Sequence, residues 1–196
     1  MTIRPLLAAA AALSLAACFG GSAPSELLTL KADQTRAVGT QRTAGPGDAI
    51  TVVEPTVPVA LQTNRVPVYV QPQTIQYLRK AFWSDDPAEL FRVVVSETIA
   101  ARTGRVVLDP GQYTAEPGTR LAGQLMMFGL DADRMEAVAV YDAVLERNRT
   151  SVVTQRFEAR VPVTVADAAT VAPALNQAAN QIAEQVAAWV GGGGGS

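Results

Sequence analysis

Side chains able to do chemistry are scarce in this chain of 196 residues, which contains one cysteine, Cys18, and no histidine. Histidine-based triads, cysteine–histidine pairs and zinc sites built from histidine or cysteine ligands are therefore excluded. Carboxylates remain, together with two lysines, Lys31 and Lys80. This composition predicts a protein that is not an enzyme and that holds no metal and no diffusible cofactor.

One group of acidic residues could be interpreted as a catalytic pair. Asp85 and Asp86 are adjacent, but Asp86 is followed at once by Pro87 and, three residues after Asp86, by Glu89. This order is typical of a helix start, with Asp86 as the cap and Glu89 as the acid of a capping box. We therefore favour the structural interpretation. A lipid-anchored enzyme would have to use Glu54, Asp85 and Glu89.

A second acidic group, Asp131 and Asp133, has the spacing that opens a calcium-binding loop. Such a loop needs a glycine at its sixth position and a glutamate at its twelfth, and this sequence has neither. A tight hairpin turn explains the two aspartates without a metal.

The first 17 residues are typical of a secretory signal. Arg4 supplies a positive charge, residues 6–15 are mainly leucine and alanine, and Ala16 and Ala17 are small enough for a signal peptidase. The apolar run is too short for a membrane-spanning helix, which needs about 20 residues. We therefore expect residues 1–17 to be a cleaved signal peptide.

The end of this segment, Leu-Ala-Ala-Cys, resembles the lipobox of bacterial lipoproteins. That resemblance implies cleavage before Cys18, a diacylglycerol on its thiol and an acyl chain such as palmitate on its new amine. The alternative is an ordinary signal peptide with a chance cysteine. Residues 18–25 are rich in glycine, serine and proline and would form a flexible tether. Phe19 stands where an aspartate commonly retains enterobacterial lipoproteins in the inner membrane, which favours the outer membrane.

Charge and cysteine content narrow the possible partners. Removal of the signal takes Arg4 away, which leaves 15 basic and 18 acidic side chains and a net charge of −3. This weakly acidic, unclustered balance argues against nucleic acid and against a polybasic membrane patch. Membrane attachment must then come from lipid, for which two or three acyl chains suffice. No second cysteine is present to form a disulfide, so stability must come from packing.

Residues 26–190 are expected to form a single domain, followed by a Gly/Ser tail at 191–196. The sequence of the first half of this domain predicts short strands and a long polar loop at 31–48. Prolines after the second strand indicate an edge or an irregular path. The expected strands are 26–30, 50–53, 66–70, 74–77 and 105–108.

Two helices are expected. The first runs from Pro87 to about Arg102 and is ended by Gly104. The second covers 167–190, with Pro173 tolerable only within its first turn. Its apolar stripe would be buried, and its polar face would be exposed to water. That polar face comprises Asn176, Gln177, Asn180, Gln181 and Glu184.

Three long strands, at 119–130, 134–146 and 150–163, are expected to form an antiparallel meander. In the last strand apolar and polar residues alternate, so one face should be covered and the other wet. The expected fold class is α+β: a mixed, largely antiparallel sheet with a C-terminal meander, covered on one face by two helices.

Four segments carry a resemblance to a known family, and one of them is the predicted helix from Pro87 through Leu90 to Arg102. Residues 77–85, YLRKAFWSD, match the pattern Y-x-x-x-A-x-W-x-D of the ABC-type transport auxiliary lipoproteins. Residues 156–162 and 174–190 continue the match. This is the family of the paraquat-inducible protein C lipoprotein.

The resemblance implies a role as a partner protein. Such lipoproteins accompany an ABC permease and ATPase together with an MCE-domain protein. These systems move lipids, which we interpret as phospholipids, between the inner and outer membranes. The resemblance places the lipoprotein on the periplasmic face of the outer membrane, without enzymatic activity, and allows a homo-oligomeric ring. The alternative is a lipoprotein of outer-membrane biogenesis that partners a β-barrel assembly or lipopolysaccharide-export complex.

Two aromatic residues in the matching segment, Tyr77 and Trp83, are open to two interpretations. Aromatic side chains serve well as anchors in protein interfaces. They serve equally as core residues at the junction of the sheet and the first helix. We name both as candidate partner contacts.

Overall fold

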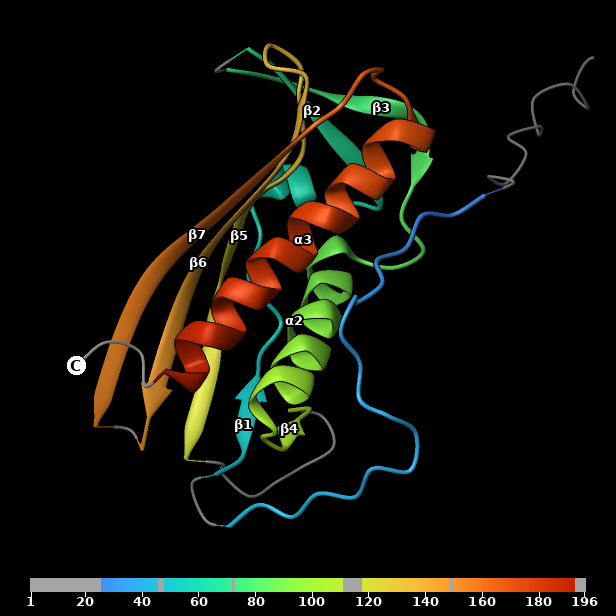
Figure 1. The fold of residues 1–196 in the computed structure, drawn as a ribbon. Helices are drawn as coiled ribbons and strands as arrows, with labels where there is room; N and C mark the ends of the chain where they lie inside the picture. Colours follow the sequence, from blue (N-terminus) through green and yellow to red (C-terminus); the bar gives the residue numbers. More distant parts are fainter. Residues whose placement is uncertain (1–25, 46–47, 72, 111–117, 149, 193–196) are drawn as a thin grey trace, which may run out of the picture.

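The computed structural model describes residues 26–45, 48–71, 73–110, 118–148 and 150–192. The predicted signal peptide, the tether and Cys18 lie outside these residues, as do residues 193–196 of the predicted tail. A seven-stranded mixed sheet carries two long helices (Figure 1). The predicted α+β class is confirmed.

The predicted meander is present. It comprises β5 (Thr119–Asp131), β6 (Glu136–Arg147) and β7 (Ser151–Pro162), all antiparallel. Its central row pairs Leu125 with Tyr141 and Tyr141 with Phe157, and all three are buried. This row explains the alternation in the sequence, because every second residue of a strand points to the same face.

The other edge of β5 is shared by two short strands. β1 (Ile50–Val52) runs parallel to the start of β5, and β2 (Arg65–Gln71) runs parallel to its end. The chain between them holds Pro55 and Pro58, which have no N–H to donate to a strand ladder, and includes the short 3-10 turn η2 (Val59–Leu61). The expected irregular path is therefore correct.

Two further strands complete the sheet. β4 (Val107–Leu108) is parallel to β1, and β3 (Thr74–Phe82) is antiparallel to β2. β3 is longer than predicted and β4 is shorter. The strand predicted at 26–30 is wrong, because that segment makes only a single parallel bridge, from Leu28 to Trp83.

Helix α2 (Pro87–Thr103) begins at the predicted residue and ends at Gly104, which adopts a φ of 73°. The predicted capping box is wrong. The Asp86 side chain makes no cap hydrogen bond, and the Asp86 N–H donates to Asp85 Oδ1 at 2.8 Å. Glu89 is instead bound by Arg92, so its carboxylate is unavailable to the helix start.

Helix α3 (Ala168–Gly191) is capped by Asp167, whose side chain accepts from the Thr170 N–H at 2.9 Å. The helix begins one residue after the predicted start, and Pro173 lies inside it, beyond the first turn to which the prediction confined this proline. The predicted apolar stripe is buried, with Trp189 partly exposed at the end. Asn180, predicted on the wet face, is only 5% exposed. The segment after Leu28 covers it.

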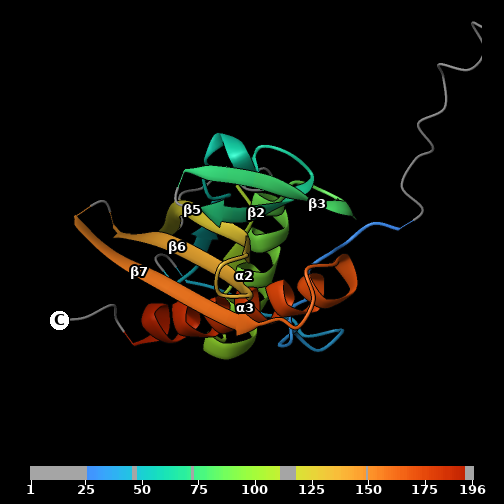
Figure 2. The ribbon, with the colours of Figure 1, turned by 90° about the horizontal axis from the view of Figure 1, so that it is seen from above.

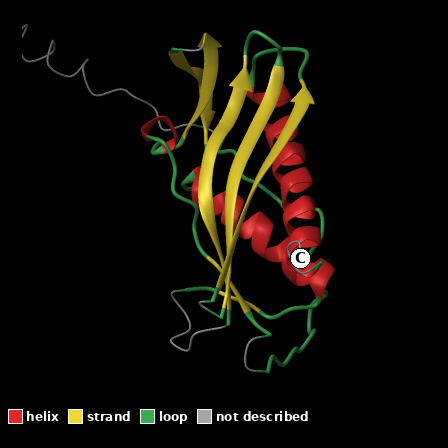
Figure 3. Cartoon of the chain, turned by 90° about the vertical axis from the view of Figure 1, so that its left-hand side faces the viewer, coloured by secondary structure: helices red, strands yellow, loops and turns green. Residues whose placement is uncertain are grey.

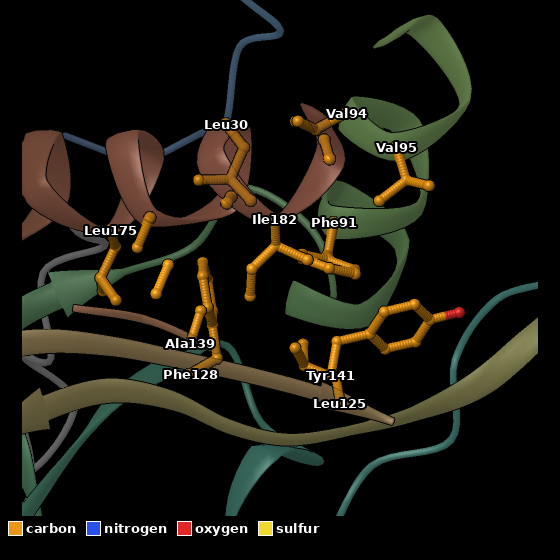
Figure 4. Packing of buried hydrophobic residues seen from close by; sticks show 14 of the residues in the cluster. Leu30, Phe91, Val94, Val95, Leu125, Phe128, Ala139, Tyr141, Leu175 and Ile182 are labelled. Atoms are coloured by element: carbon orange, nitrogen blue, oxygen red, sulfur yellow. The ribbon is translucent and has the colours of Figure 1, made fainter. Parts of the chain in front are cut away.

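Both helices lie on the same face of the meander, as the end-on and side views show (Figures 2 and 3). Between helices and sheet lies the main core, part of which is drawn in Figure 4. Phe91 of α2 lies edge-on to Phe128 of β5 and Tyr141 of β6, at centroid distances of 6.4 and 5.2 Å. On β7, the Phe157 ring lies edge-on to Trp189 of α3 at 5.6 Å. The expectation of one helix-covered face is therefore correct.

The opposite face is not uniformly wet, which corrects the sequence expectation. Val138 and Val140 of β6 point away from the helices but are buried. Val138 pairs with Gly129 on one side and with Arg160 on the other. The Tyr69 ring of β2 lies against Gly129, so the outer face near this end is covered by an aromatic ring and an arginine stem.

Candidate functional site

Trp83 lies in the core with 1% of its surface exposed. Its ring stacks on Phe128 with centroids 5.5 Å apart and an interplanar angle of 25°. Its backbone is held at the end of the β2–β3 hairpin, where the Trp83 N–H donates to the Asn64 carbonyl at 2.6 Å. The core interpretation therefore holds for this residue. The prediction that Trp83 contacts a partner is wrong, because its ring is not available at the surface.

Tyr77 occupies a half-buried position on β3. Its hydroxyl donates to the Ala60 carbonyl at 3.2 Å, and the Arg65 guanidinium lies 4.7 Å from the ring centroid. Such a cation–π contact is weak at an exposed position. Tyr77 is thus partly exposed and lies beside an exposed arginine, and both residue types are enriched in protein interfaces.

The segment after the predicted tether is fastened to α3. The Leu28 N–H donates to the Phe82 carbonyl, and the Ser84 N–H donates to the Leu28 carbonyl, both at 2.7 Å. Further along, the Lys31 N–H donates to Asn176 Oδ1 at 2.7 Å. Residues 28–31 are thus held against the end of β3 and against α3.

Asn180 completes this fastening. It accepts from the Asp33 N–H at 2.8 Å and donates to the Lys31 and Asn176 carbonyls, each at 2.9 Å. Sequence reasoning missed this role. The available signal was the pair Asn176 and Asn180, four residues apart on one helix face and beside the apolar stripe.

The acids that an enzyme would need do come together. The pKa of Glu54 is raised by burial first and then by the negative charges of Glu89 and Asp86, while Arg92 opposes the shift. Arg92 donates to both oxygens of Glu89, at 2.7 and 2.6 Å, and lies 3.1 Å from Asp109. The Glu89 carboxylate is thus neutralised by a structural ion pair. This arrangement binds a helix end to the loop after β4.

The aspartates of the possible calcium loop form the predicted hairpin turn. Asp131 Oδ1 accepts from the Arg134 N–H at 3.3 Å, and Asp131 Oδ2 pairs with Arg160 at 2.9 Å. Arg160 also contacts Glu136 and Glu158. Among the residues that the structure describes, no group of acids, cysteines or histidines could hold a metal ion.

A groove of about 670 Å³ opens between the C-terminal ends of α2 and α3. Arg102 and Glu184 face each other across it with their charged atoms 3.0 Å apart, and both side chains are about half exposed. This exposed ion pair is screened by solvent and adds little stability. Within the described ranges, no helix is both long enough and apolar enough to cross a bilayer.

Comparison with known proteins identifies one family. The family described as "ABC-type transport auxiliary lipoprotein component" matches residues 28–187. No curated protein is similar enough in sequence to count as a relative.

Solved structures share the fold. Protein XCC0632 from Xanthomonas campestris is similar at 19% identity and a TM-score of 0.66, over 84% of this chain and 93% of that one. The crystal structure of an uncharacterized protein is similar at 12% identity and a TM-score of 0.65, over 84% of this chain and 99% of that one. At these identities the likeness concerns the fold alone.

Proposed function

The chain belongs to the family of ABC-type transport auxiliary lipoprotein components, and from this premise we propose that it is a lipid-anchored docking protein of an MCE-type ABC transport system. It acts by binding the MCE-domain protein, in company with the permease and ATPase. The system moves phospholipids between the inner and outer membranes. The chain itself carries out no catalytic step.

The family match carries this proposal, because it extends from residue 28 to residue 187 and so takes in all seven strands, α2 and α3 up to Ala187. The arrangement of the acidic residues that the structure describes also supports a docking role. Asp131 and Asp142 are each bound by an arginine of another strand. Glu89 is bound by Arg92 of the same helix, which also pairs with Asp109 after β4. A docking protein needs such a rigid body and a free surface.

The anchor is proposed to be Cys18, acylated after removal of residues 1–17. Phe19 after this cysteine supports the periplasmic face of the outer membrane as the destination. Two or three acyl chains hold a protein on a membrane firmly, at about 0.8 kcal/mol for each buried CH₂ group. A ring of several copies would present several such anchors to one membrane.

Tyr77 is the contact that we propose for the partner. Its ring is partly open to solvent and adjacent to the exposed Arg65, and both residue types are enriched in binding hot spots. Replacing Tyr77 with alanine should weaken partner capture. Tyr77→Phe is the matched control, because it keeps the ring and loses only the hydrogen bond to the Ala60 carbonyl.

Affinity purification of the tagged, lipidated chain from its own cell envelope tests the function. We expect an MCE-domain protein and its ABC components in the purified material. Capture of a β-barrel assembly or lipopolysaccharide-export protein in their place would overturn the proposal. That result would favour the alternative role in outer-membrane biogenesis.

A further inference from the structure

The long axis of the molecule has two distinct ends. One end carries the β2–β3 hairpin tip, the β5–β6 turn and the loop from β7 to α3 (Figure 1). These are adjacent, because Tyr69 pairs with Asp131 and the Val163 N–H donates to the Met135 carbonyl at 2.9 Å. We call this the hairpin end. The other end carries the β6–β7 turn and the end of α3, and we call it the distal end.

The chain that leads to Cys18 leaves the fold nearer the hairpin end. Leu28 bridges to Trp83, whose ring stacks on Phe128, so the exit lies level with Phe128 of β5. Phe128 is three residues from the end of β5 at Asp131 and nine from its start at Thr119. At a rise of about 3.3 Å per residue, the exit is about 10 Å from the hairpin end and about 30 Å from the distal end.

The number of residues between Cys18 and the fold limits how the domain stands on a membrane. Eight peptide units join Cys18 to Glu26. They span at most about 26–29 Å when fully extended, and about 16 Å is typical for a chain rich in glycine and serine. The hairpin end therefore reaches the bilayer without stretching the chain. The distance of about 30 Å to the distal end slightly exceeds this full extension, so the distal end is out of reach of the bilayer that holds the Cys18 lipid.

Exposed apolar side chains occur at and near this end, while others lie in the loop before β1 (Val38), in η2 (Val59), in α2 (Val93) and in β7 (Val152). Ile75 at the hairpin tip is 45% exposed, Val165 before α3 is 53% exposed, and Leu27 at the exit is 55% exposed. Ile75 pairs with Tyr69, which in turn pairs with Asp131 of the β5–β6 turn. Apolar side chains raised on turns are suited to the boundary between lipid head groups and acyl chains.

We propose that the hairpin end is a membrane-contact surface, on which Ile75 and Val165 touch the bilayer that holds the Cys18 lipid. The distal end then points into the aqueous space. This inference rests on the proposed lipid anchor but not on the identity of the transport partner. It assigns a lipid surface to one end of the fold and leaves the distal end free for proteins.

The test uses the full lipidated chain in vesicles of phosphatidylethanolamine and phosphatidylglycerol with a spin-labelled lipid. A single new cysteine, from Val165→Cys or Ile75→Cys, carries a fluorophore sensitive to polarity. Val152→Cys is the matched control, because Val152 is a valine of similar exposure, at 64%, beside the β6–β7 turn of the distal end. Mass spectrometry first establishes that Cys18 is acylated, so that only the new thiol takes the label.

The expected result is a blue shift and quenching by about twofold or more at positions 165 and 75, as for groups in the interface, with neither at position 152. Equal quenching at all three positions, quenching at 152 alone, or no quenching at all would overturn the proposal. So would an unacylated Cys18. If the chain captures the transporter but fails this test, only the proposed orientation is wrong. A chain that passes it but captures no transporter contradicts only the proposed function.

Discussion

The two sides of β5 are built in different ways. On one side β6 pairs with β5 from end to end, with a single register shift between Leu125 and Met127, and β7 continues the pattern. On the other side β1 and β2 take up only the two ends of β5, with a proline-containing stretch between them. The meander side is regular and lies under α3. The broken side bends around the core and supports the segment that leads to Cys18.

The two sides of β5 therefore differ in role: one mainly stabilises the domain, and the other holds the segment after the tether. The meander side is held by continuous ladders and by the apolar core beneath the helices. The broken side shares that core through Ile50, Val66 and Trp83, and it also makes local contacts, namely the close approach at Gly129 and the Leu28 bridge. The segment after Leu28 is held to α3 by the Asn180 hydrogen bonds. A change in the core should therefore unfold the whole domain, whereas a change on the broken side should loosen one connection.

The largest effect is expected for Phe128→Ala. Phe128 is fully buried, stacks on Trp83 and lies edge-on to Phe91, so it joins the broken side to α2. Replacing a buried phenylalanine with alanine lowers the free energy of unfolding by about 3–5 kcal/mol. Urea unfolding measures this loss. Val152→Ala is the exposed control, and a loss for Phe128→Ala no larger than that of the control would contradict the shared core.

A smaller effect is expected for Gly129→Ala, which tests the close contact between β2 and β5. A Cβ at this position would lie 2.3 Å from the Pro67 carbonyl oxygen, so β2 must shift. Overpacking of this kind costs about 1–3 kcal/mol. Gly191→Ala is the control, because its added Cβ would lie 3.4 Å from Thr103 Cγ2. Equal unfolding midpoints for the two variants would show that β2 and β5 are not tightly packed at this position.

Asn180→Ala should loosen the segment after the tether more than it weakens the domain. The substitution leaves the Asp33 N–H and the Lys31 carbonyl without their partner. We expect a cost of about 1 kcal/mol, at the lower end for a lost hydrogen bond, because the freed segment can reach water. Hydrogen exchange at the Asp33 amide should accelerate clearly. Unchanged exchange there, or equal acceleration in the exposed control Gln177→Ala, would contradict the fastening role.

The smallest effect concerns the exposed pair of Arg156 and Asp142 on the outer face of the meander. The Arg156 hydrogen bonds hold the pKa of Asp142 below its ordinary value of 3.8. Because the pKa is lower in the folded state, the pair contributes stability above the unfolded pKa and loses it as pH falls through the folded pKa. An NMR titration of Asp142 should therefore show a low pKa that rises in Arg156→Gln. An unchanged Asp142 pKa in that variant would show that Arg156 does not cause the shift.

The sequence was most informative where local patterns decide the structure. Alternation predicted the meander, and the Asp-Pro and Gly residues marked the ends of α2. It failed where distant contacts decide. Asn180 is polar on its helix, but residues 31 and 33 cover it, and Glu89 pairs with Arg92 in preference to completing a capping box. Val138 became buried because Tyr69, 69 positions earlier in the chain, lies over its neighbour Gly129.

The candidate site was predictable to a similar extent. The pattern from Tyr77 to Asp85 indicated the family, which the match over residues 28–187 shows. The pattern could not distinguish an exposed aromatic residue from a buried one, because Tyr77 and Trp83 lie on one strand and its extension. Only the tertiary contact with Phe128 places Trp83 in the core.

The central claim is that the chain works only when it is tethered to a membrane. Its most direct test replaces residues 1–18 with an ordinary secretory signal, which delivers residues 19–196 to the periplasm without a lipid. Resistance to detergent is then measured in a strain that lacks the native gene. We expect the lipidated chain to restore the outer-membrane barrier and the soluble chain, present in equal amount, to fail. Full restoration by the soluble chain would contradict the account.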